Sequence, residues 1–174
     1  MYSLTYTAAY DPYHTVFRML GLVFNMQRDK EINIETLRIA DFFHCFPWLL
    51  KEMSAYTKIP EFLKHKNMVV RLNPRPKFGK LPDSRIMFER MFASQLAAKN
   101  LLEINGIFES NDDILIYNSL DSIGVELTQR VESYATENSE LLKFISSKLM
   151  LVPLQGPGGL KDRSGLSEFR YDNV

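Results

Sequence analysis

The chain has 174 residues, 45% of them hydrophobic, which predicts one folded domain with a buried core and excludes two large domains or a disordered chain. Its 21 Lys and Arg balance 21 Asp and Glu, so the net charge gives no support to binding nucleic acid or anionic lipid over the whole surface. A single cysteine excludes an internal disulfide, and no apolar run approaches the roughly 20 residues of a membrane span, so we expect a cytoplasmic protein without membrane attachment.

The first half of the chain predicts two helices joined by a short strand. Asp11 and Pro12 suit the start of a helix over residues 12–26, because Asp caps helices well and Pro fits the first turn. A strand over residues 31–34 and a helix over residues 35–46 follow. The inward positions of the two helices are Tyr13, Val16, Phe17, Leu20, Val23 and Phe24, and then Ile39, Phe42, Phe43 and Phe46.

Residues 47–83 read as an irregular insertion. Residues 47–66 suggest broken helix, with Pro47 ending the preceding helix and Pro60 able to open a short turn around Phe62 and Leu63. Residues 73–82 contain three prolines and one glycine, which predicts a loop.

The second half predicts a third helix over residues 84–102, a β-hairpin over residues 104–117, and two more helices. The third helix turns Phe88, Met91, Phe92 and Leu96 inward, and the hairpin turns at residues 110–113. The last two helices are marked by Ile123, Leu127, Val131 and Tyr134, and by Leu142, Ile145, Leu149 and Val152.

This order of elements predicts a mostly α fold with a small β-hairpin (α+β), arranged as a winged helix-turn-helix with an insertion and two C-terminal helices. The predicted domain covers residues 1–152. Residues 153–174 have no helical period and are predicted to form an extended C-terminal arm, so that removing residues 159–174 should leave the fold intact and abolish complex formation.

The net charge is zero, but the charged residues are unevenly distributed along the chain. Residues 58–80 hold seven basic residues and one acidic residue, whereas residues 103–140 hold nine acidic residues and one basic residue. Glu109, Asp112 and Asp113 on the hairpin would repel DNA phosphates, so the basic insertion is the better DNA candidate. An alternative is a solvated loop, or one that pairs with an acidic protein. The candidate DNA-binding residues are Lys64, Lys66, Arg75, Lys77 and Lys80.

No pattern for catalysis, cofactor binding or metal binding is found in the sequence. His44 and Cys45 are neighbours on a predicted helix, so their side chains point roughly 100° apart and do not form a nucleophile–base pair. The glycines fit neither a phosphate-binding loop nor a dinucleotide fingerprint. We therefore expect a protein that is not an enzyme and has no cofactor.

The C-terminal residues suggest docking on a partner. Leu160, Leu166, Phe169 and Tyr171 alternate with Arg and Lys in a segment too polar to bury itself. Arginine and aromatic residues are enriched at protein interfaces, and an extended arm can pair with a partner's surface. The alternative is a disordered terminus.

Several segments together resemble a known family. They are Asp11-Pro12-Tyr13-His14 with Phe17-Arg18, residues 37–42, residues 46–50, residues 159–166, and Phe169-Arg170-Tyr171-Asp172. With these segments the chain resembles the middle component of bacterial three-component ABC systems, a class that includes proteins of Lamassu-type defence against phage and plasmids. Residues 51–80 do not take part in the resemblance.

The resemblance implies a non-enzymatic adaptor between an SMC-like ABC ATPase, which engages DNA, and an effector, often a nuclease. ATP hydrolysis and DNA cleavage would belong to those partners. Two residues of the first helix could instead serve the fold and not a partner: Asp11 as a helix cap, and Arg18 by pairing with an acid of the tail. A stand-alone winged-helix DNA-binding regulator is the alternative function. The candidate partner-binding residues are Tyr13, His14, Arg18, Arg163, Leu166, Phe169, Arg170, Tyr171 and Asp172.

Overall fold

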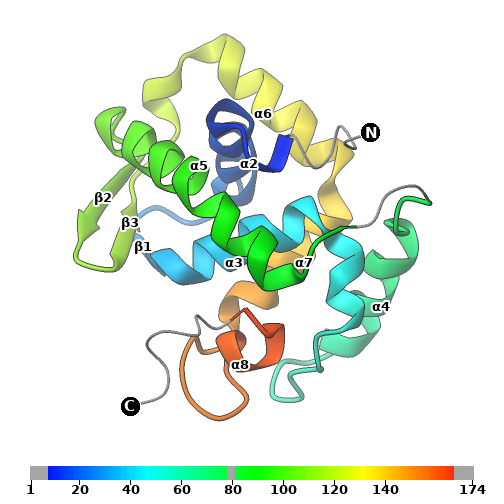
Figure 1. Ribbon diagram of the computed structural model, residues 1–174. Helices are drawn as coiled ribbons and strands as arrows, with labels where there is room; N and C mark the ends of the chain where they lie inside the picture. Colours follow the sequence, from blue (N-terminus) through cyan, green and yellow to red (C-terminus); the bar gives the residue numbers. More distant parts are fainter. Residues whose placement is uncertain (1–7, 78–80, 167–174) are drawn as a thin grey trace.

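The computed structural model describes residues 8–77 and 81–166, which form a body of packed helices with one small antiparallel sheet at its edge (Figure 1). The helices are α2 (Pro12–Val23), α3 (Ile34–Cys45), α4 (Phe62–Leu72), α5 (Ser84–Ile104), α6 (Val125–Glu137), α7 (Ser139–Ser147) and α8 (Leu160–Ser164). Short 3-10 helices are η1 (Pro47–Lys51), η2 (Asp121–Ile123) and η3 (Leu149–Leu151). The strands are β1 (Lys30–Asn33), β2 (Phe108–Asn111) and β3 (Ile114–Tyr117). This architecture confirms the mostly α prediction.

The first two helices begin as the sequence predicts. The Asp11 carboxylate accepts a hydrogen bond from the His14 amide at 2.9 Å, and Asn33 caps α3 through the Glu35 amide, also at 2.9 Å. Side-chain oxygens at these positions satisfy amides that a helix start leaves without partners. The sequence therefore places α2 and α3 correctly to within three residues.

The predicted hairpin is present and has a third strand. β2 and β3 pair around a turn at Asp112 and Asp113, and β1 pairs with the other edge of β3, giving the strand order β1-β3-β2. Leu115 lies opposite Ile32 on one side and Ser110 on the other. The sheet therefore ties the start of α3 to the end of α5.

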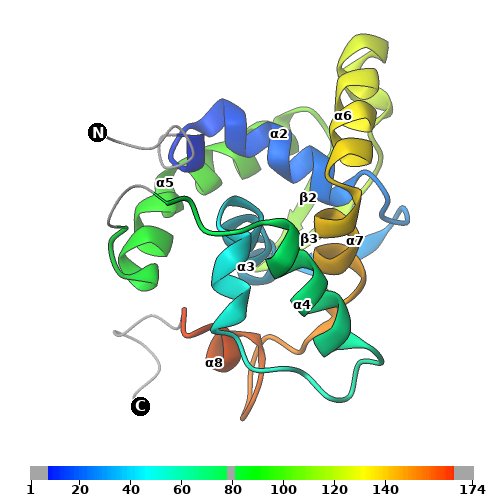
Figure 2. The ribbon, with the colours of Figure 1, turned by 90° about the vertical axis from the view of Figure 1, so that its right-hand side faces the viewer.

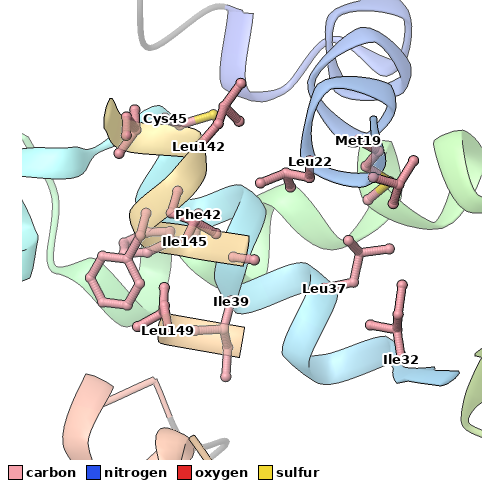
Figure 3. Packing of buried hydrophobic residues seen from close by; sticks show 14 of the residues in the cluster. Met19, Leu22, Ile32, Leu37, Ile39, Phe42, Cys45, Leu142, Ile145 and Leu149 are labelled. Atoms are coloured by element: carbon pink, nitrogen blue, oxygen red, sulfur yellow. The ribbon is translucent and has the colours of Figure 1, made fainter. Parts of the chain in front are cut away.

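Helix α3 lies at the centre of the molecule. Figure 2 shows α2 above it and α8 below it. Its residues from Thr36 to Cys45 are all buried, which accounts for the charged side chains found in the core. In Figure 3, Leu142, Ile145 and Leu149 lie beside Ile39 and Phe42 of α3. The two predicted C-terminal helices thus complete the core.

The prediction of an irregular insertion is wrong for residues 62–72, which form α4. Phe62 and Val69 on one side of this helix are buried, and Lys66 lies between them. The lysine interrupts the apolar pattern, and α4 starts after Glu61 with its backbone in the left-handed region, φ 55°. The helix therefore lacks both a continuous apolar pattern and a capping side chain, which are the sequence signals of a helix. Residues 73–77 and 81–83 have no regular structure, as predicted for the proline-rich loop.

Two of the predicted inward residues of α5 point outward. Phe88 and Met91 are buried, but Phe92 is 48% exposed and Leu96 is 39% exposed. Ser94 and Gln95 face the core instead. Polar groups of the core bind these two side chains, so the buried stripe contains residues that a hydrophobicity pattern assigns to solvent. Tyr13 of α2, also predicted inward, is 80% exposed.

The prediction that residues 153–174 form an extended arm without helix is wrong for the described part. Residues 160–164 form α8, and the side chains of Leu160 and Leu166 are buried at 0% and 2% exposure. A helix of five residues is too short to show a helical period. Gly165, with φ +67°, ends it in a conformation that favours glycine. The described helices include none with the length and apolarity needed to cross a membrane.

Candidate partner-binding surfaces

The predicted contact residues of α2 divide into exposed and buried ones. Tyr13 is 80% exposed and His14 is also exposed, so both are available to a partner. Arg18, one turn further along, is only 7% exposed. The α2 candidates therefore do not form one surface.

Arg18 instead belongs to a buried polar network. Its Nε and Nη2 donate to the two carboxylate oxygens of Asp41 at 2.6 and 3.1 Å, and its Nη1 donates to the Ala8 carbonyl at 2.9 Å. Gln95 Nε2 donates to the same Asp41 carboxylate at 3.0 Å. The alternative pairing of Arg18 with an acid of the tail is not found among the described residues, where its carboxylate partner is Asp41. One buried carboxylate thus joins α2, α3 and α5.

The network extends to a second buried arginine. Arg38 Nε donates to Gln95 Oε1 at 3.0 Å, and its guanidinium also pairs with Glu35 and lies over the Phe88 and Phe92 rings. Its carbon Cζ is 4.5 Å from the centre of the Phe88 ring and 4.8 Å from that of Phe92. Such stacking combines a cation–π attraction with an ion pair.

Burial changes the protonation chemistry of this region. Burial lowers the pKa of Arg18, but the charge and hydrogen bonds of Asp41 outweigh it and raise that pKa overall. Burial lowers the pKa of His44 to about 4. His44 Nε2 shares a hydrogen bond of 2.8 Å with the Tyr134 hydroxyl. Burial raises the pKa of this hydroxyl. Arg18 therefore stays charged and His44 stays neutral at pH 7.

The described C-terminal candidates make contacts within the chain. Arg163 donates to the Ala55 carbonyl and to Ser54 Oγ, the latter at 3.1 Å, and its guanidinium lies 5.1 Å from the centre of the Tyr56 ring. Leu166 is buried. These contacts hold α8 against the segment after η1. Phe169, Arg170, Tyr171 and Asp172 lie outside the described residues.

The predicted DNA-binding residues also divide into exposed and buried ones. Lys64, Arg75 and Lys77 are exposed, and Lys64 pairs with Glu61 at 2.9 Å. Lys66 is buried, and its Nζ donates to the Met53 carbonyl at 2.6 Å, so this ammonium is not available to DNA. Lys80 lies outside the described residues. In Figure 1, α4 and the acidic hairpin occupy opposite sides of the molecule.

His44 and Cys45, the two neighbours that do not form a nucleophile–base pair, lie in the core. Burial and the nearby Asp41 carboxylate raise the pKa of the Cys45 thiol well above its ordinary value, which disfavours the nucleophilic thiolate. Among residues 8–77 and 81–166, no three His, Cys, Asp or Glu side chains gather in a way that could hold a metal ion.

The feature that sequence reasoning missed is the outer face of α5. From Phe92 to Ile104, every exposed residue of this helix is uncharged, and only Asn100 is polar. Ile104 is 82% exposed and Leu101 is 40% exposed. The two charged residues in this stretch, Lys99 and Glu103, are half-buried and pair with each other at 2.9 Å. The exposed residues, here called the α5 face, are Phe92, Ala93, Leu96, Ala97, Asn100, Leu101 and Ile104.

Solvent-facing helix surfaces normally carry charged residues, and contiguous exposed apolar patches mark interaction sites. The small side chains of Ala93 and Ala97 allow a partner helix to approach closely, with larger apolar side chains on both sides of them. A sequence clue was present, because the apolar residues of α5 are too numerous for a single buried stripe. The arrangement suits burial against an apolar surface of another protein.

One comparison with known proteins identifies the family of the chain. A family model described as "ABC-three component (ABC-3C) system Middle Component 5" matches residues 4–172. No curated protein and no solved structure gives a match.

Proposed function

This chain belongs to the family of ABC-three component system middle components, and on this premise we propose that it is a non-enzymatic adaptor. In this proposal it joins an SMC-like ABC ATPase to an effector, a nuclease, within a cytoplasmic bacterial defence system of the Lamassu type. The complex acts on phage or plasmid DNA. ATP hydrolysis and DNA cleavage belong to the partners.

The α5 face is the observation that carries the proposal. A component of a multi-component system has protein partners, and this face is an uncharged, exposed surface about four turns of helix long. A few residues near the centre of an interface supply most of the binding free energy, and the buried centre is more apolar than the rest of the protein surface. We assign the α5 face to the contact with the ABC ATPase.

We further propose that α2, β1, α3, α5, β2 and β3 form a winged-helix module. The order β1-β3-β2 brings the strand after the first helix beside the hairpin that follows α5. In a DNA-binding winged helix, the helix before the hairpin enters the major groove and carries polar or basic side chains. The apolar α5 face, with Asp112 and Asp113 on the neighbouring hairpin, favours a protein partner over DNA at this position.

A stand-alone DNA-binding regulator is the second candidate function, and the exposed Lys64, Arg71, Arg75 and Lys77 favour it. A regulator binds duplex DNA by itself, with affinity that falls steeply as salt is added. An adaptor shows such binding only when the ATPase is present. A binding titration of the purified chain against duplex DNA at two salt concentrations separates the two functions.

Co-purification tests the adaptor directly. The chain is co-expressed with the ABC ATPase encoded beside its gene, either as wild type or with both Leu96→Glu and Ile104→Glu. Leu151→Glu serves as a matched control, because Leu151 is 51% exposed but lies on η3. We expect wild type and the control to elute with the ATPase and the double variant to elute alone. A double variant that stays folded and bound contradicts the assignment.

A further inference from the structure

An open groove runs along one face of α6, apart from the α5 face. It has a volume of about 510 Å³ and is lined by side chains of α6 together with Phe17 of α2. The rings of Phe17 and Tyr134 form its aromatic floor, with centroids 4.9 Å apart and planes at 60°. The α6 residues that line it follow a helical spacing of three and four: Glu126, Gln129, Arg130, Ser133, Tyr134 and Glu137.

Neighbouring positions fix the shape of the floor. Gly21 of α2 lies directly under Tyr134, and a Cβ there would come within 2.9 Å of the ring carbon Cε1. The Tyr134 hydroxyl is held by His44 at 2.8 Å. Gly21 therefore contacts one edge of the Tyr134 ring and His44 holds its hydroxyl, while the ring also lines the groove. Tyr13, 80% exposed and one turn before Phe17, continues the aromatic surface along α2.

The charges at the groove favour a cation. Arg130 is already paired with Glu126 at 2.8 Å, and the positive charge of Arg18 behind the floor is compensated by Asp41. Glu137 has no ion-pair partner among the described residues, so the groove keeps one free carboxylate beside two aromatic rings. A carboxylate near an aromatic ring is an environment suited to a cationic side chain.

The same combination already holds an arginine elsewhere in the chain. Arg38 lies over Phe88 and Phe92 while its guanidinium pairs with Glu35. A planar guanidinium can stack on a ring and bind a carboxylate at once, whereas an ammonium acts as a compact, strongly hydrated charge. This internal example favours arginine over lysine as the occupant.

We propose that this groove binds an arginine-bearing segment of a protein partner, with the guanidinium stacked on Phe17 and Tyr134 and paired with Glu137. Gln129 and Ser133 are placed to hydrogen-bond the backbone of the segment. The inference extends the proposed adaptor function by adding a second contact surface, distinct from the α5 face and selective for a cation.

A labelled peptide of four Gly-Arg repeats, titrated into the full chain and followed by fluorescence polarisation, tests the proposal. We expect Glu137→Gln to weaken binding about fivefold, and Phe17→Leu to weaken it by a similar factor. Thermal unfolding checks that the Phe17→Leu chain is folded. Glu132→Gln is the matched control, because it removes a charge from an exposed α6 residue outside the groove and should change affinity less than about twofold. A Gly-Lys peptide should bind more weakly than the Gly-Arg peptide.

Equal losses in Glu137→Gln and Glu132→Gln would show general attraction to an acidic helix and overturn the proposal. So would equal affinity for the lysine and arginine peptides, or no binding to wild type. The adaptor function fails separately: if the chain binds the arginine peptide through Glu137 but never co-purifies with its ATPase, the groove stands and the adaptor does not. If the double variant on α5 loses the ATPase while Glu137→Gln binds the peptide as wild type does, the groove alone fails.

Discussion

Arg18 and Asp41, 23 positions apart, form a bidentate ion pair in the core, with Nε–Oδ1 at 2.6 Å and Nη2–Oδ2 at 3.1 Å. The Asp41 side chain is fully buried and that of Arg18 is 8% exposed. Gln95 adds a third hydrogen bond to the same carboxylate. The position of α5, and therefore of its exposed face, depends on this pair because Gln95 lies on α5.

Asp41→Ala should be strongly destabilising. It leaves the Arg18 guanidinium buried without its counter-ion, a change that costs about 3–5 kcal/mol in the free energy of unfolding. Glu126→Ala is the control: it breaks the exposed Arg130–Glu126 pair and should cost less than about 1 kcal/mol. Urea unfolding of both variants measures the difference. Similar small losses in the two would show that the buried pair is unimportant for stability.

Acid should destabilise the protein through His44. Burial lowers its pKa to about 4 from an ordinary 6.5. At a pH between these values, His44 binds a proton in the unfolded chain but not in the folded chain. Stability is then full above about pH 6.5 and falls as the pH drops toward 4, by up to about 3 kcal/mol. The free energy of unfolding, measured across this range, checks the slope.

His44→Gln separates this effect from carboxylate titration. Glutamine does not titrate, so the variant should show a flatter pH dependence between 6.5 and 4. His14→Gln is the matched control, because it makes the same substitution at an exposed position outside the core. If His44→Gln keeps the full slope, the titrating group lies elsewhere.

Local patterns predicted much of the fold, and long-range polar contacts escaped prediction. Asp11 and Pro12 fix the start of α2 through neighbours in sequence, and the turn at Asp112 fixes the hairpin in the same way. Asp41 had no sequence mark that paired it with Arg18. Because this pair and Gln95 place polar groups inside, the hydrophobic pattern wrongly turns Phe92 and Leu96 toward the core, although both belong to the exposed face proposed to bind the ATPase.

Truncation tests the packing of α8 and Leu166 against the rest of the fold. A chain ending at Pro157 loses the buried Leu160 and Leu166 and the Arg163 contacts to Ser54 and Ala55. We expect a loss of more than about 3 kcal/mol, because removing one buried leucine side chain already costs about 2–5 kcal/mol. A chain ending at Leu166 keeps these contacts and should be more stable in urea than the chain ending at Pro157. Equal stability of both truncated chains would contradict the packing of α8.

The basic side of the molecule gives a further prediction. Arg75→Glu with Lys77→Glu should weaken DNA retention by the assembled complex and spare its assembly, because both side chains are exposed. Lys66→Met should leave DNA retention unchanged, since this ammonium is held by Met53 inside the fold. Filter binding at several salt concentrations measures both. A DNA defect in Lys66→Met with normal stability would contradict the assignment.

Labelling of a single cysteine tests whether the ABC ATPase covers the α5 face. The native Cys45 is buried, so an Ala97→Cys chain carries one accessible thiol at the middle of the face. Lys143→Cys on α7 provides an exposed control. We expect maleimide to label both thiols readily in the free chain, and only the position-97 thiol to react at least about tenfold more slowly once the ATPase is bound. An unchanged rate at position 97 in a complex that has demonstrably formed would contradict this expectation.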